Sequence, residues 1–502
     1  MSFALLFVMG AAWAVASPLL SGSDEGAHAI KAAAVVRGEL RGANTGPRGR
    51  PWLVHVPAPL AQAQVPFTLC YLYRTGTAGS CGFSVGGPTS IVQVNTQFGG
   101  YPPLYYLAVG LPSLAAPSAL GLYLMRLVSV AITSAFLASA LVSAFSWRRS
   151  RMLVLGTGVA IVPTVIYVGA MINDSGLEIS PAICLWVSLL VFVLDPPPDG
   201  GGRLLTRAGV SAGALVLARP LSPLWLVVIV CTVLALVNRQ RLAAVLRRRD
   251  VQAWAAAVAV CTGLAVVWTT SVGVAVVGRP CPSRCTSPFV TGYVLSHTDT
   301  YVRQMTGLFS YNNVAAPLFT FVLWWTLVAA LVVVALVVGR RRQALVLVGL
   351  AAATIFLPVA IQLVEASNYG ILWQGRYSLP LAAGIPLLAA FIIGWRSPGL
   401  ERRHRQLATT AIVAIAVGHA GAFIWCLRHF MWGQGQWSFL HSQWEPPVPG
   451  IVLVIAFVAV TSAYAWWLRA QFAVGGAPAA PSTPGGRGGS ARGDRQSGSQ
   501  PR

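Results

Sequence analysis

Residues 17–40, SPLLSGSDEGAHAIKAAAVVRGEL, directly follow the first apolar run of the chain. They place two adjacent acids, Asp24 and Glu25, together with His28, where that run ends. The whole chain contains only 13 acidic residues, so a pair of them at this position is unusual. A charged group so close to hydrocarbon is costly to desolvate, which makes these residues candidates for a functional site.

Composition identifies the class of protein around this stretch. The 502 residues are 56% hydrophobic and only 10% charged, whereas soluble domains carry about 25% charged residues. Repeated apolar runs of about 20 residues indicate membrane-spanning helices. The formal net charge of +22 comes largely from short arginine clusters between those runs, a pattern typical of cytoplasmic loops. We therefore expect a lipid bilayer around the chain and no nucleic-acid partner.

The arginine clusters predict the topology, because cytoplasmic loops are enriched in Lys and Arg. They lie at residues 148–151, 203–207, 239–249, 340–342 and 396–405. We expect an all-α polytopic protein of the plasma membrane with about twelve transmembrane helices and both termini cytoplasmic. The expected spans cover residues 4–20, 119–145, 153–171, 176–194, 205–218, 222–237, 253–277, 316–338, 344–364, 378–395, 407–426 and 449–468.

This topology divides the chain into a membrane domain and a tail. Residues 1–470 form the integral membrane domain, and residues 21–100 form a large first extracytoplasmic loop that carries juxtamembrane helices. Residues 101–114 are apolar but short and bracketed by prolines, so we expect an interfacial helix or half-helix there. Residues 471–502, rich in Gly, Ser, Pro and Arg, are expected to form a disordered cytoplasmic tail.

The eight cysteines give an independent check on this topology. Four of them lie within expected spans, where Cys behaves as a small apolar residue. The other four, Cys70, Cys81, Cys281 and Cys285, fall on the expected outer face, where disulfides can persist. We predict local disulfides between Cys70 and Cys81 and between Cys281 and Cys285.

Three outward-facing acids are candidates for catalysis: Asp24, Glu25 and Asp174, the last in the tight turn INDSG at residues 172–176. The alternative explanation is helix capping. Ser23 and Asp24 could cap a helix that starts at Glu25, and Asn173 could cap the span that follows it.

His28 and several cations complete the candidate set. His28 lies one turn past Asp24 on the same helical face, where it could orient a carboxylate, bind a metal or simply occupy the interface. Arg126, Arg219, Arg376 and Lys31 face outward, against the usual bias. Guanidinium groups bind phosphate bidentately; the alternative is that these side chains extend to lipid headgroups.

Together these groups could transfer a sugar from a lipid-linked phosphate. A carboxylate can take the proton from an acceptor hydroxyl as that oxygen attacks the anomeric carbon. The cations can stabilise the departing phosphate, where negative charge develops. A divalent cation such as Mg²⁺ or Mn²⁺, held by Asp24, Glu25 and His28, could share that work.

At these residues the chain resembles the DUF2142 family of polytopic membrane proteins. The motifs that carry the resemblance are SDEGAH at 23–28, YPPLYY at 101–106, RL at 126–127, ND at 173–174 and QGRY at 374–377, in that order. The family in turn resembles the C-type (GT-C) glycosyltransferase superfamily, which includes protein mannosyltransferases and lipid A aminoarabinose transferases. The similarity covers most of residues 1–430.

This resemblance implies a GT-C-like fold, a polyprenyl-phosphate sugar donor, inverting transfer, and a catalytic acid at Asp24 or Glu25. Tyr105, Gln374 and Tyr377 lie in the shared motifs and are expected to contact the substrate. The acceptor would be an envelope glycan, lipid or protein. Two other functions stay open: a transporter or flippase of lipid-linked glycans, and a non-catalytic membrane protein of envelope assembly.

Overall fold

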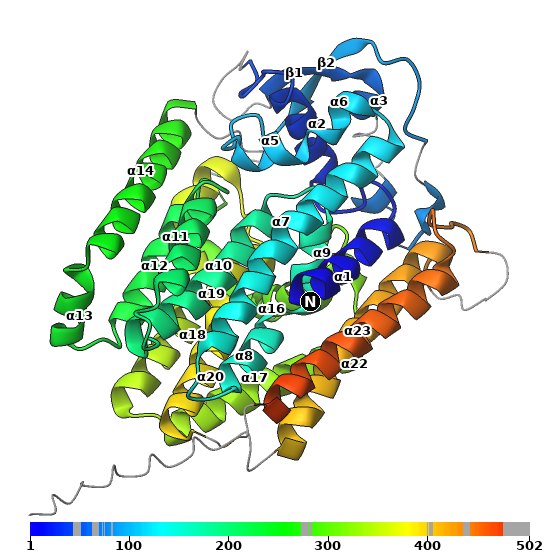
Figure 1. Cartoon of the computed structure of the whole chain (residues 1–502). Coiled ribbons are helices and arrows are strands. Elements are labelled where there is room, and N and C mark those ends of the chain that lie inside the picture. The colour runs from blue at the N-terminus through cyan, green and yellow to red at the C-terminus, as the bar shows by residue number, and fades with distance from the viewer. Residues whose placement is uncertain are drawn as a thin grey trace, which may run out of the picture.

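The computed structural model describes residues 1–43, 52–62, 70–72, 74, 76–81, 84–272, 281, 284–398, 400, 405–434 and 442–474. Figure 1 shows a bundle of long helices, with shorter elements gathered over one end. The helices of the bundle are α1 (Ser2–Ala16), α7 (Ala119–Ser146), α10 (Ser175–Leu189), α11 (Gly202–Val216), α12 (Ser222–Leu234), α14 (Arg249–Val272), α17 (Leu318–Val338), α18 (Arg341–Tyr369), α19 (Gly375–Ala382), α20 (Gly384–Arg396), α22 (Arg405–Trp432) and α23 (Gly450–Val474).

The described residues contain eight helices that are long and apolar enough to cross a membrane, or nine if α8 (Met152–Ala160) and α9 (Pro163–Ala170) form one broken span. The helices α1 and α12 are apolar but shorter. A polytopic helical membrane protein is therefore confirmed, whereas the expected twelve spans are not. The sequence predicted one unbroken helix over residues 153–171. Instead α8 and α9 meet at 55°, because a proline lacks the backbone N–H and starts a new helix.

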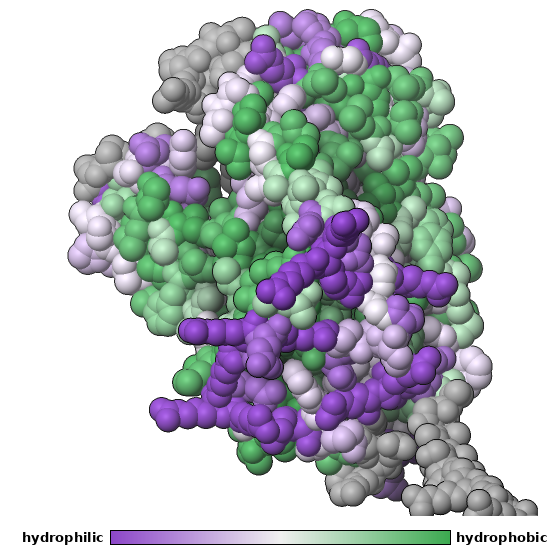
Figure 2. Space-filling view, turned by 60° about the vertical axis from the view of Figure 1, so that its left-hand side comes forward, coloured by the Kyte–Doolittle hydropathy of each residue, from purple (hydrophilic) through white to green (hydrophobic). Residues whose placement is uncertain are grey.

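Arginine clusters lie at one end of the bundle. They stand where α7 ends and α8 begins, at the start of α11, around α13 (Arg239–Leu246), at the start of α18, at the end of α20 and at the start of α22. Figure 2 shows hydrophilic side chains gathered below a broad apolar surface. That polarity suits a helix bundle whose middle is surrounded by lipid.

A small cap covers the opposite end of the bundle. It contains α2 (Glu25–Val35), the antiparallel strands β1 (Trp52–Pro57) and β2 (Ile91–Thr96), and the short helices α3 (Ala58–Gln62), α5 (Leu104–Val109) and α6 (Pro112–Ala115). Every residue of α2 is buried. The helices α5 and α6 have only 6 and 4 residues, so residues 101–114 do not span, as expected.

The strands depart from the all-α expectation. In β1 the side chains of Trp52, Val54 and Val56 are buried and alternate with more exposed neighbours, a period typical of a half-buried strand. A second antiparallel pair, β3 (Leu308–Phe309) and β4 (Val314–Ala315), follows α15 (Ser287–Ser296) and α16 (Thr298–Gly307). At the other end of the chain, α23 continues past residue 471, where the tail was expected to begin. Residues 475–502 lie outside the described part of the chain.

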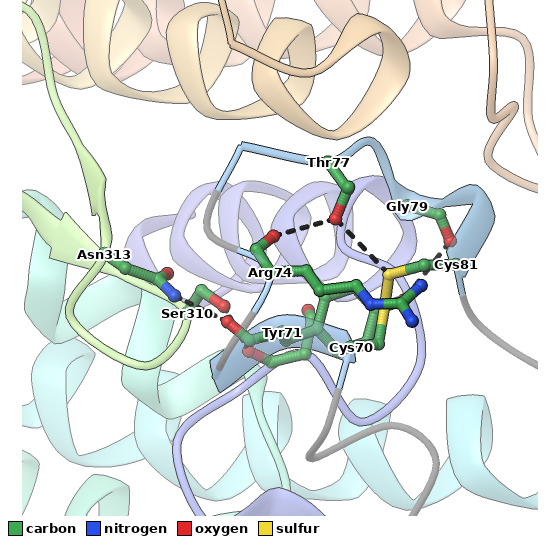
Figure 3. The surroundings of a disulfide bond; sticks show 9 residues. Cys70, Tyr71, Arg74, Thr77, Gly79, Cys81, Ser310 and Asn313 are labelled. Carbon is green, nitrogen blue, oxygen red and sulfur yellow. Dashed lines mark hydrogen bonds between the residues drawn. A yellow bond between two sulfur atoms is a disulfide. The ribbon is translucent and has the colours of Figure 1, made fainter.

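The structure contains both predicted disulfides. The Cα atoms of Cys70 and Cys81 are 5.7 Å apart, and those of Cys281 and Cys285 are 5.4 Å apart. Figure 3 shows that the first disulfide holds a short loop beside the turn between β3 and β4. There the side-chain amide of Asn313 donates to the carbonyl of Tyr71 at 2.5 Å. The disulfide therefore fixes part of the first loop against a segment far away in sequence.

Replacing Cys70 and Cys81 together by serine is expected to lower the free energy of unfolding by about 2–4 kcal/mol, because the unfolded chain gains freedom when the loop is no longer closed. Thermal unfolding of the purified variant measures the loss. Cys231→Ser is the matched control, since Cys231 is a free and exposed thiol. An equal midpoint for the double variant and the control would contradict this stabilising role.

Candidate active site

Asp24 precedes α2 but does not cap it. Its backbone is left-handed, with φ 62° and ψ 5°, and its carboxylate makes no cap hydrogen bond. Asp24 Oδ2 instead accepts from Arg376 Nη2 at 2.5 Å, and Oδ1 accepts from Gln97 Nε2 at 3.3 Å. Left-handed backbone is uncommon outside glycine and costs free energy. The Asp24 carboxylate therefore contacts Arg376 and does not cap its own helix, and the backbone that allows this is an unfavourable one.

The capping explanation fails for Ser23 as well and holds for Asn173. The hydroxyl of Ser23 donates to the carbonyl of Ser310 at 2.6 Å. Asn173 Oδ1 accepts from the backbone N–H of Ser175 at 2.9 Å, at the start of α10. Asn173 Nδ2 also donates to the carbonyl of Ser23 at 2.9 Å, so it ties α10 to the segment that carries Asp24.

Glu25 also pairs with an arginine, but it is more deeply buried than Asp24 and has a different partner. Its side chain is fully buried and accepts from Arg126 Nε at 2.6 Å and from Arg126 Nη2 at 2.7 Å. Its two oxygens also accept backbone N–H groups from Gly22 and Ile172, each at 3.1 Å. A carboxylate offers about four acceptor positions, so these four donors leave none of them for a substrate.

Arg126 is equally occupied. Besides Glu25, its guanidinium donates to the carbonyls of Ala14 and Ser17 at 2.7 Å and of Pro18 at 2.8 Å. Every guanidinium N–H is thereby used. The sequence suggested that Arg126 binds phosphate, but this geometry leaves it no donor for a ligand. It joins α7 to the end of α1 and to the start of α2.

A second acidic cluster lies at the start of α10. Asp174 is fully buried; its Oδ2 accepts from the hydroxyl of Tyr106 at 3.2 Å, and Arg219 Nε lies 3.5 Å from its Oδ1. Arg219 Nη1 also donates to Glu178 at 3.3 Å. Glu178 accepts further hydrogen bonds from Ser222 and Trp225. Burial raises the pKa of Asp174 to about 6, although the charge of Arg219 opposes that shift.

His28 faces the same cluster as a neutral imidazole. Its ring stacks on Phe98 with centroids 3.7 Å apart, and its Nδ1 lies 2.8 Å from the Tyr106 hydroxyl. The Tyr106 proton is donated to Asp174, so His28 Nδ1 must carry the hydrogen in that bond. Burial, together with Arg219 and Arg376, lowers the pKa of His28 well below its usual value. His28 therefore orients Tyr106 rather than adding charge.

The raised pKa of Asp174 predicts a pH-dependent stability. Between about pH 4 and about pH 6 the folded state keeps a proton that the unfolded state has released, so stability falls as pH rises through this window. Asp174→Asn should remove this fall, on the order of 2 kcal/mol. Thermal midpoints at pH 4.5 and 7.5 measure it, with the exposed Asp299→Asn as control. The same pH response in Asp174→Asn as in wild type would refute it.

Two arginines from distant segments converge on one aromatic ring. The Arg219 guanidinium lies 4.6 Å from the centroid of the Tyr377 ring, and that of Arg376 lies 5.3 Å from it. Arg376 Nε is buried without a hydrogen-bond partner. Like charges brought this close repel each other unless an anion lies between or beside them. The Asp24 side chain, at 24% exposure, is the most accessible acid among the described residues that contact these arginines.

Three further residues were expected to contact the substrate or its phosphate, and the structure places them differently. Lys31 is buried and donates to the carbonyls of Leu40 at 2.5 Å and Gly99 at 2.6 Å; burial lowers its pKa to about 7. The Tyr105 hydroxyl bonds Ser129 and the backbone of Asn173. Both residues fix the cap and leave no obvious contact for a substrate. Gln374, by contrast, precedes Arg376 and accepts weakly from Asn312 at 3.4 Å.

The residues proposed for a divalent cation do not fit one. Glu25 is bound to Arg126, His28 to Tyr106, and Asp24 to Arg376. Among the described residues, no three His, Cys, Asp or Glu side chains lie close enough to hold a metal ion. The expectation of a metal site at Asp24, Glu25 and His28 is therefore not supported.

Comparison with known proteins assigns the family. The model described as "Predicted membrane protein (DUF2142)" matches residues 7–385. The chain belongs to the DUF2142 family. A crystal structure of ArnT from Cupriavidus metallidurans in the apo state matches with a TM-score of 0.34 and 14% identity, over 74% of this chain and 65% of that chain. The match thus spans less than two thirds of that protein. No curated protein matches the chain.

The site of this DUF2142 protein includes residues to which the sequence analysis assigned no role in the site. They are Gln97, Tyr101, Tyr106 and Glu178, and a narrow pocket beside Arg376 that is also lined by Gln304, Ser310 and Asn312. Glu178 is an outward-facing acid in the predicted topology, and it lies one helical turn after Asp174, so the two share a helix face. The sequence around Ser310 contains no pattern that indicates a place in the site. Its contribution depends on a tertiary contact between distant parts of the chain.

Proposed function

We propose that this protein is a membrane glycosyltransferase. It moves a sugar from a polyprenyl-phosphate-linked donor to an envelope glycan, lipid or protein on the extracytoplasmic face. One observation carries the proposal: a partly exposed carboxylate, Asp24, is held against Arg376 beside a second cation, Arg219. These are the charges that such a transfer requires, one anion for the acceptor proton and two cations for the leaving phosphate.

Asp24 is the proposed general base. It takes the proton from an acceptor hydroxyl while that oxygen forms a bond to the anomeric carbon. The bond between the anomeric carbon and the phosphate oxygen breaks at the same time, and its electron pair leaves with the lipid phosphate. Attack from the face opposite the leaving group inverts the anomeric centre. Asp24 is preferred to Glu25 and Asp174 because both of those side chains are fully buried.

Arg376 and Arg219 are proposed to bind the lipid phosphate. Negative charge grows on this phosphate as the bond breaks, so preorganised cations lower the barrier more than they stabilise the bound substrate. The unpartnered Nε of Arg376 supports this role. Tyr377 keeps the two guanidinium groups apart and in position through its ring. When phosphate binds, Arg376 can release Asp24, which would then be free to accept a proton.

The position of the site within the bundle supports an extracytoplasmic location. The arginine clusters mark the opposite end, and such clusters face the cytoplasm. The site is thus proposed to lie outside the plasma membrane, with the chain's termini inside. The charged residues of the site gather near this end rather than near the middle of the spans, which favours transfer over transport, since transporters bind substrate near the midplane.

Cells that lack the protein provide the test. We expect one envelope sugar to be missing and its polyprenyl-phosphate donor to accumulate, because the step that consumes the donor is blocked. Mass spectrometry of lipid extracts and of hydrolysed envelope glycans measures both quantities, with cells that express the wild-type chain as control. Unchanged glycans and unchanged lipid-linked sugars would refute the proposed reaction.

A further inference from the structure

A second cavity lies at the arginine-rich end of the bundle, opposite the candidate active site. It is formed between α22 and α23, which run side by side in Figure 1. The cavity holds about 380 Å³ of empty space, part of it open to solvent. Its lining residues are Arg405, Ala408, Thr409, Ile412, Arg469 and Phe472.

Two arginines stand over this cavity. Arg405 opens α22 and Arg469 lies near the end of α23, so the antiparallel packing of the helices brings both cations to one side. Both residues are exposed, and no acid in the described part of the chain forms an ion pair with either of them. Two cations over one opening attract an anion.

The rest of the lining is mostly apolar. Ala408, Ile412 and Phe472 are all buried, and Thr409 is the one uncharged polar residue of the lining. The cavity therefore changes from cationic at its mouth to apolar along its wall. A phospholipid has the same sequence of polarity, from phosphate to acyl chain. Basic pockets between transmembrane helices on the cytoplasmic side are suited to anionic lipid headgroups.

We propose that this cavity binds an anionic phospholipid of the cytoplasmic leaflet. Arg405 and Arg469 hold the phosphate, and an acyl chain lies along Ile412 and Phe472. Residues 475–502 contain four arginines and one aspartate, so the charge of that segment does not complement two arginines. The site is independent of the proposed transfer reaction.

Native mass spectrometry of the purified full-length chain in mild detergent tests the proposal. Phosphatidylglycerol is titrated, and the fraction of protein that carries the lipid is measured. We expect saturable binding to the wild type and an affinity about 30-fold lower for Arg405→Gln/Arg469→Gln, since each basic residue contributes about 1 kcal/mol near an anionic headgroup. The charge-preserving variant Arg405→Lys/Arg469→Lys should keep most of the affinity.

The controls distinguish lipid binding at this cavity from nonspecific attraction to positive charge and from binding of other ligands. Arg203→Gln/Arg341→Gln removes the same charge from two exposed residues at the same end of the bundle and should bind like the wild type. Phosphatidylcholine should bind weakly, and inorganic phosphate in large excess over the lipid should not displace it. Equal losses in the two glutamine variants would overturn the proposal. So would equal binding of phosphatidylcholine, or displacement by phosphate.

Discussion

Asp24→Asn is expected to lower the rate of sugar transfer by at least about 100-fold, because the amide cannot accept the acceptor's proton. Asparagine has the same shape and tolerates left-handed backbone, so the turn before α2 is preserved. Its carbonyl oxygen can still accept from Arg376. The protein should therefore accumulate in the membrane and unfold at a temperature close to that of the wild type.

Complementation of cells that lack the protein measures this effect through the amount of transferred sugar. Asp299→Asn is the matched control, since it removes an exposed carboxylate outside the site. Alanine is a poorer choice at position 24, because a Cβ without a side-chain hydrogen bond adds strain at positive φ. A wild-type level of sugar in cells that carry Asp24→Asn would rule out Asp24 as the base.

Arg126→Met is expected to destabilise the fold by about 3–5 kcal/mol, because it leaves the Glu25 carboxylate buried without its cation. It also removes the donor to three carbonyls at the end of α1. The amount of protein in membranes and its thermal midpoint measure the loss. The double variant Glu25→Gln/Arg126→Met should recover part of the stability, because no uncompensated charge remains.

The same two variants distinguish a structural role of Arg126 from a role in substrate binding. If Arg126 has a structural role, its replacement lowers both the amount of protein in membranes and the thermal midpoint. If Arg126→Met instead accumulated and unfolded like the wild type but failed to transfer sugar, Arg126 would contact the substrate, as the sequence first suggested. The double variant would then show no recovery.

Much of the fold could be predicted because its signals are local. Apolar runs indicated the helices, arginine clusters indicated one end of the bundle, and the cysteines on the expected outer face indicated both disulfides. The short helices at residues 101–114 followed from length and proline content. The break at Pro163 is also local, but the apolar pattern continues through it and so predicts one unbroken span. The alternation in β1 was likewise readable from the sequence.

The pairing of charges within the site could not be predicted. Asp24 and Glu25 are neighbours, yet their partners Arg376 and Arg126 stand 352 and 101 residues away. The backbone of Asp24 is left-handed, with φ 62°, and its carboxylate contacts Arg376 whereas that of Glu25 contacts Arg126. Aspartate tolerates left-handed backbone better than most residues, but no pattern in the sequence marks position 24 as one that adopts it. The different roles of the two acids thus depend on tertiary contacts.

Release of polyprenyl phosphate from a lipid-linked sugar tests the proposed reaction without interference from the rest of the cell. Lipids extracted from cells that lack the protein are incubated with the purified chain and an envelope extract as acceptor. We predict that the wild type consumes one polyprenyl-phosphate sugar and releases free polyprenyl phosphate in equal amount, and that Asp24→Asn does not. A lipid-linked sugar that stays intact in the presence of the wild-type protein would contradict the assignment as a glycosyltransferase.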